Sequence, residues 1–185
     1  MSSITLQKPK LSVKVQSLAA ISAVAAAVAL PQLFHAMGAV SGLGTALGEI
    51  FLPMHLPVIL VGLLAGPYAG AVAGLLSPLC SFALSGMPSF AMLPFMMIEL
   101  FVYGLAAGLL RNIKLPDAAK VLAAQIAGRA VRAVAILISV YGFGNGTVGA
   151  AVIWKSIPAG IFGIVLQLVL IPLIVYRVEN LKRYE

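Results

Sequence analysis

The sequence predicts an all-α polytopic membrane protein, a bundle of six transmembrane helices with both termini in the cytoplasm. Of its 185 residues, 62% are hydrophobic and 9% are charged, whereas soluble domains usually carry about 25% charged residues. The apolar residues form separate segments, and most basic residues lie in three clusters beside them. A bilayer core about 30 Å thick needs roughly 20 apolar residues per helix, so the chain has enough for about five or six crossings. We therefore expect a single membrane domain over residues 1–185.

Six apolar segments give the predicted helices, and glycine, proline or charged residues separate them. In chain order they are Val13–Met37, Phe51–Ala65, Ala69–Leu84, Phe90–Leu110, Ala118–Val140 and Val148–Tyr176. The first follows a group of lysines, as the core of a secretion signal would, but its apolar run exceeds the roughly 7 to 15 residues of such a core. We expect it to remain in the protein as the first helix.

The second and third segments are short, about 15 residues each. Their connection is uncharged, so charge does not decide between two spans and one re-entrant hairpin; we favour two spans, which gives six helices. Four glycines recur here at four-residue intervals: Gly62, Gly66, Gly70 and Gly74. This spacing is typical of close helix packing. The alternative is that short segments interrupted by glycine and proline mark a binding site.

The basic residues predict the orientation, because the cytoplasmic loops of membrane proteins are enriched in lysine and arginine. Nine of the twelve lie in three clusters: Lys8, Lys10 and Lys14; Arg111, Lys114 and Lys120; Arg177, Lys182 and Arg183. We expect these clusters in the cytoplasm, with residues 1–12 and 177–185 as short tails and the first, third and fifth connections outside. This distribution indicates the orientation of the helices in the membrane, and we expect no nucleic-acid partner.

Four charged residues remain for the membrane itself: Glu99, Arg129, Arg132 and Lys155. A charge at the bilayer centre costs about 2.5–3.5 kcal/mol even on the lenient scale, so these side chains should face the bundle interior or a wet cavity. At 1.5 Å per residue, Glu99 lies about 13 Å and Arg132 about 12 Å below the outer surface. We expect Glu99 to pair with one of the two arginines. One carboxylate cannot neutralise three basic groups, so the outer half keeps positive charge that a ligand's carboxylate, phosphate or carbonyl groups could complement.

The sequence shows no enzyme signature, and it predicts neither a metal site nor a cofactor. His35 and His55 fall near the outer ends of their helices, but no third ligand lies nearby in sequence, so we interpret them as interfacial or ligand-binding histidines. Cys80 is the only cysteine. Paired membrane acids, a nucleophile elbow and a phosphate-binding loop are all absent from the sequence. The chain therefore does not hydrolyse ATP by itself.

Small residues recur on the first helix at a four-residue interval: Ala19, Ala23 and Ala27. A smooth stripe of this kind lets another helix approach closely. Internal packing and contact with a partner protein are both open from the spacing alone.

A set of short motifs runs through the chain: Pro53-Met-His-Leu-Pro-Val58, Gly62, Gly66-Pro-Tyr-Ala-Gly70, Ser85-Gly-Met-Pro88, Glu99 with Tyr103-Gly104, and Gly128-Arg129. Together they resemble the substrate-binding S component of energy-coupling factor (ECF) vitamin transporters. The resemblance covers the chain from about Val13 to Tyr176 and is strongest from Phe51 to Gly108.

The resemblance implies a multi-pass protein of the prokaryotic cytoplasmic membrane that binds its vitamin in the outer half of the bundle. It also implies partners: a transmembrane coupling subunit, met by the alanine stripe of Ala19, Ala23 and Ala27, and two cytoplasmic ATPase subunits of an ECF module. With the charge analysis, it gives these expected substrate-binding residues: His55, Met87, Glu99, Tyr103, Arg129, Arg132, Trp154 and Lys155.

The outer region of the sequence also bears on the substrate. A methionine-rich outer region adapts to a large, irregular ligand, and similarity leans toward the cobalamin members, with pantothenate, pyridoxine and hydroxymethylpyrimidine as alternatives. A self-sufficient carrier or channel for a small anion is the rival function, and a membrane scaffold without a ligand is a second rival.

Overall fold

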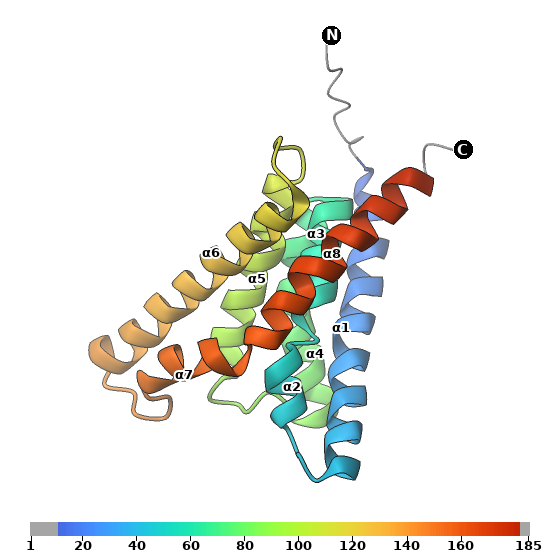
Figure 1. The fold of residues 1–185 in the computed structure, drawn as a ribbon. Coiled ribbons are helices and arrows are strands. Elements are labelled where there is room, and N and C mark those ends of the chain that lie inside the picture. Colours follow the sequence, from blue (N-terminus) through green and yellow to red (C-terminus); the bar gives the residue numbers. More distant parts are fainter. Residues whose placement is uncertain (1–10, 182–185) are drawn as a thin grey trace.

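The computed structural model describes residues 11–181, and this part of the chain contains helices and no strand. Figure 1 shows them as a bundle. In chain order they are α1 (Val13–Ser41), α2 (Ala46–Phe51), α3 (His55–Ala65), α4 (Pro67–Ser85), α5 (Leu93–Leu110), α6 (Asp117–Leu137), the π-helical turn η1 (Ile138–Gly142), α7 (Ala151–Ala159) and α8 (Ile161–Leu181).

Six stretches within the described residues are long and apolar enough to cross a membrane, which confirms the predicted all-α polytopic bundle. Two predicted segments are built differently from the expectation. The second span includes α2 as well as α3 and covers Ala46–Ala65, so it begins earlier than the predicted Phe51. The last predicted segment divides at Gly160 into the short α7 and the spanning α8.

The first turn of α1 and the last turn of α8 lie at the same end of the bundle, together with the connection between α5 and α6 (Figure 1). The short helices α2 and α7 lie toward the opposite end (Figure 1). Of the predicted tails, residues 1–10 and 182–185 lie outside the described residues. The C-terminal tail was predicted to begin at residue 177. Helix α8 continues through Arg177 to Leu181, and the cytoplasmic position of the tail stays a prediction.

Local sequence explains where the helices begin and end. The Ser12 hydroxyl accepts a hydrogen bond from the backbone N–H of Val15 and caps the start of α1. Gly66 has φ 111°, a backbone conformation that L side chains rarely adopt, and it ends α3. Pro67 then occupies the first position of α4, where its missing N–H is not needed. Gly86 closes α4 in the left-handed conformation.

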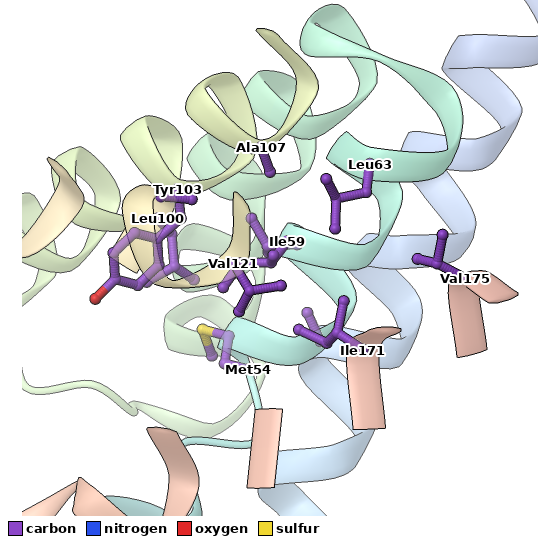
Figure 2. Packing of buried hydrophobic residues seen from close by; sticks show 12 residues of the cluster. Met54, Ile59, Leu63, Leu100, Tyr103, Ala107, Val121, Ile171 and Val175 are labelled. Carbon is purple, nitrogen blue, oxygen red and sulfur yellow. The ribbon is translucent and has the colours of Figure 1, made fainter. Parts of the chain in front are cut away.

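The central core joins α1, α3, α5, α6 and α8, and Figure 2 shows it from close by. Ile59 and Leu63 of α3 lie among side chains from the other four helices. The Tyr103 ring belongs to this cluster, while its hydroxyl oxygen points away from the carbon side chains (Figure 2). The Tyr103 hydroxyl therefore lies at the border of the apolar cluster.

Glycines bring α4 and α5 into backbone contact. A Cβ atom added at Gly70 would collide with the Gly104 backbone, and one added at Gly104 would collide with Gly70. Gly74 lies in the same way against the Leu100 carbonyl. Close packing is therefore confirmed for Gly62, Gly70 and Gly74, which lie against α5, whereas an added Cβ at Gly66 would meet no atom closer than 3.6 Å.

The alanine stripe of α1 faces into the bundle. Ala23 is 7% exposed and packs in one cluster with Ala69 and Ala73 of α4, while Ala27 is fully buried in the central core. Ala19 is partly buried against the same α4 cluster. Because internal packing accounts for these three residues, their role in docking a coupling subunit stays a prediction.

Candidate functional site

A cavity of about 530 Å³ lies at the end of the bundle where α2 and α7 are found. Its wall comes from α1, α2, the break between α2 and α3, the helix α4 and its connection to α5, and the helices α5, α6 and α7. Small-molecule sites usually enclose about 300–1,000 Å³. Most of the lining is apolar, with a few polar and charged groups, as expected of a site for a small organic molecule.

Glu99 anchors the charged part of this cavity. Its side chain is 1% exposed, and each carboxylate oxygen accepts one hydrogen bond. Tyr103 donates from its hydroxyl to Oε1 at 2.7 Å, and Arg132 of α6 donates from Nη1 to Oε2 at 2.9 Å. The ion pair predicted from matching depth is therefore confirmed, and Arg132 is the partner.

Arg129 and Lys155 complete the basic groups of the wall. Arg129 donates from Nη1 to the Ser156 carbonyl of α7 at 3.5 Å, a long contact. Lys155 lies on the exposed part of α7. The lining contains three basic side chains against two carboxylates, Glu49 and Glu99. A positive excess remains, smaller than the sequence indicated because Glu49 offsets part of it.

Four lining residues carry a buried nitrogen that has no hydrogen-bond partner within the described part of the protein: Nδ1 of His35, Nδ1 of His55, Nε of Arg129 and Nε of Arg132. His55 is 5% exposed, and its ring stacks at a tilt on Tyr103 with 5.3 Å between centroids. Buried polar groups in proteins are almost always hydrogen-bonded. These four atoms are therefore unsatisfied polar groups within the wall of the cavity.

Six of the eight predicted binding residues line the cavity: His55, Met87, Glu99, Arg129, Arg132 and Lys155. Tyr103 does not line it, and it lies behind the wall and holds Glu99. Trp154 does not line it either. This side chain is 75% exposed and borders a separate hollow of about 240 Å³ between α6 and α7. A role for Trp154 in substrate binding therefore stays a prediction that the lining of this cavity does not support.

Sequence reasoning missed Glu49 and left His35 out of the site. Glu49 belongs to the six-residue helix α2, which follows a glycine-rich stretch and carries too few residues to show helical periodicity. His35 lies on α1 with its ring against Gly48, where a Cβ would meet the ring at 2.9 Å. Its position near the outer end of the first helix was the available signal.

The described residues hold no group of three or more histidine, cysteine, aspartate or glutamate side chains that could bind a metal ion. His35 and His55 both line the cavity, yet no such group forms around them. The side chains present are suited to hydrogen bonds and ion pairs with an organic ligand.

Six membrane-spanning helices and a cavity of small-molecule size define the class of this protein: a multi-pass membrane protein suited to bind an organic solute. The family model described as ECF transporter, substrate-specific component matches residues 16–175. The chain belongs to this family and is a substrate-specific subunit of an ECF transporter, not an enzyme. None of the curated proteins and none of the solved structures matches it.

Proposed function

We propose that this subunit captures a small, carboxylate-bearing vitamin in the cavity and delivers it to an ECF module in a prokaryotic cytoplasmic membrane. The module consists of a transmembrane coupling subunit and two ATPase subunits on the cytoplasmic side. Family membership supports association with such a module and with a small-molecule substrate. It also favours a subunit over the rival self-sufficient carrier.

The basic side chains of the cavity wall carry the proposal. Arg129 and Arg132 both line the cavity, and among the described residues only Arg132 of the two pairs with a carboxylate. Arginine binds carboxylates through directional, charge-assisted hydrogen bonds that are about twice as strong as neutral ones. A ligand carboxylate next to Arg129 would complement the positive excess, while the apolar lining receives an uncharged body.

The cavity volume favours the smaller of the candidate vitamins. A volume of about 530 Å³ suits a drug-sized molecule, whereas a corrinoid with its nucleotide loop is several times larger. Pantothenate carries a carboxylate, and pyridoxine and hydroxymethylpyrimidine do not. We therefore propose pantothenate or a vitamin of similar size and charge ahead of cobalamin.

Calorimetry on the purified chain tests the site, with pantothenate, pyridoxine, hydroxymethylpyrimidine and cobalamin as titrants. We expect pantothenate to bind and Arg129→Gln to weaken its binding about tenfold or more, because a hydrogen bond to a charged group contributes about 1.5–3 kcal/mol. Lys155→Gln is the matched control, since its exposed charge is screened and should change affinity only a few-fold. Equal affinity in both variants and the wild type would remove Arg129 from the site.

Co-purification tests the partners. Tagged protein should carry a coupling subunit and ATPases from the native membrane, and vitamin uptake should stop when those genes are deleted. Uptake that continues unchanged without them would favour the self-sufficient carrier.

A further inference from the structure

A buried amide pair lies between α6 and α8, outside the lining of the cavity. Gln125 of α6 donates from Nε2 to Oε1 of Gln167 at 2.9 Å. Gln167 of α8 donates from its own Nε2 to the backbone carbonyl of Leu52 at 3.1 Å. The two side chains are 4% and 1% exposed. Hydrogen bonds between polar side chains are one of the interactions that fix helices to each other inside a bilayer.

The acceptor of the hydrogen bond from Gln167 is the carbonyl of Leu52, whose backbone conformation is unusual. Leu52 ends α2 with φ 49° and ψ 49°, a left-handed conformation, and it is the one described residue other than glycine with positive φ. Such conformations persist when surrounding contacts hold them, and they concentrate at binding sites. The Leu52 carbonyl also accepts the backbone N–H of His55 at 3.1 Å. Gln167 therefore binds the break between α2 and α3 at its turning point.

This break is part of the cavity wall. Leu52 and His55 both line the cavity, and so do the two residues between them. The His55 ring rests on Tyr103, which donates to Glu99, which in turn pairs with Arg132. Arg132 and Gln125 lie seven residues apart on α6, which is about two turns. Successive contacts thus connect Gln125 to Arg132 through α8, the break between α2 and α3, and α5.

We propose that Gln167, oriented by Gln125, is a positioning residue for the cavity: it holds the wall segment 52–55 in the conformation that sets His55 against Tyr103, the hydrogen-bond donor to Glu99. Neither glutamine lines the cavity, so the effect on a ligand passes through the wall. The consequence for ligand affinity rests on the proposed function, whereas the effect on the wall segment does not.

Hydrogen exchange of the full chain in detergent micelles tests the effect on the wall without any ligand. Gln167→Met keeps the length of the side chain and removes the donor to Leu52. We expect exchange of the segment 48–58 to rise about three- to twentyfold, the range that corresponds to typical and maximal interhelical hydrogen bonds in membrane proteins. Exchange in residues 69–74, at the packed start of α4, should not change.

Two further variants make the result specific. Gln125→Met removes only the group that orients Gln167, so it should raise exchange in 48–58 by a smaller factor. This variant also replaces Gln167→Met as the test if Gln167→Met does not fold. Gln16→Met is the matched control, because Gln16 also donates to a backbone carbonyl, that of Leu11, at the start of α1 and far from the cavity. It should leave 48–58 unchanged.

The proposal is overturned if 48–58 exchanges at the wild-type rate in both variants, or if 69–74 accelerates to the same extent, since that would show a general loss of packing. Pantothenate titration of the same proteins adds the functional arm, in which Gln167→Met should weaken binding. A wild type that binds none of the four vitamins would refute the proposed function, and the exchange data would still decide the role of the glutamines.

Discussion

Glu99 shows how single residues are placed in this protein. Its carboxylate is nearly inaccessible, and its two oxygens are bound by donors from its own helix and from α6. A buried ion pair gains little net stability compared with apolar side chains of the same shape, because both charges lose their hydration. Losing one partner is different, since it leaves an uncompensated buried charge. Removal of either partner of this ion pair should therefore destabilise the protein strongly.

We predict that Glu99→Gln destabilises the chain by about 3–5 kcal/mol, because Arg132 then remains in the bundle without its carboxylate. Thermal unfolding in detergent measures the effect. Glu49→Gln is the control: Glu49 lines the same cavity but is exposed, so the change should stay within about 0.5 kcal/mol. Similar melting temperatures for the two variants would contradict the structural role of Glu99.

At the scale of elements, the contact between α4 and α5 depends on the absence of side chains. Gly70, Gly74 and Gly104 let the two backbones touch, and any Cβ there would collide with backbone atoms. In a bilayer, apolar side chains gain nothing by leaving lipid for another helix, so close van der Waals contact carries more of the association.

Gly104→Ala should therefore destabilise the bundle by about 1–3 kcal/mol, the usual range for an overpacked interface. Gly146→Ala provides the control, because an added Cβ there meets no atom within 4 Å. Detergent melting curves compare the two. An unchanged transition for Gly104→Ala would mean that α4 and α5 can separate without loss.

The alanine stripe of α1 has two interpretations, internal packing and docking of a coupling subunit, and substitutions on this helix distinguish them. Ala23→Leu should lower the melting temperature of the isolated chain, because Ala23 packs against α4. Ala25→Leu, on the exposed side of α1, should not. If Ala23→Leu melts like the wild type and only loses co-purification with a coupling subunit, the alanine stripe is a docking face after all.

At the scale of the whole molecule, the bundle is asymmetric along its axis. The cavity lies at the end with α2 and α7, and the connection between α5 and α6, with its basic residues, lies at the other. The rule that basic loops stay in the cytoplasm predicts that the cavity end faces outward. Such an orientation would let the protein capture a solute from outside the cell.

Cysteine labelling in intact cells tests this orientation. In a Cys80→Ser background, Ser89→Cys at the cavity end should react with a membrane-impermeant maleimide, and Lys114→Cys in the α5–α6 connection should not. Both positions are exposed in the structure. The reverse pattern would invert the topology and remove the argument for capture from outside.

The sequence by itself determined the number of spanning helices, the tight packing of glycines, and the pairing of Glu99 with an arginine of the fifth predicted helix. Each of these follows from a property along one helix: apolar length, residue spacing or rise per residue. Six of the predicted cavity residues followed from the same arguments together with the family resemblance.

Only the tertiary structure decided which side of each helix faces a neighbour. It selected Arg132 over Arg129 as the partner of Glu99, turned Trp154 away from the cavity and brought Gln167 to Leu52, which lies 115 residues earlier. The physical reason is the solvent. Lipid is as apolar as the interior of the bundle, so a buried face and a lipid-facing one carry similar residues, and the pattern of hydrophobicity does not distinguish them.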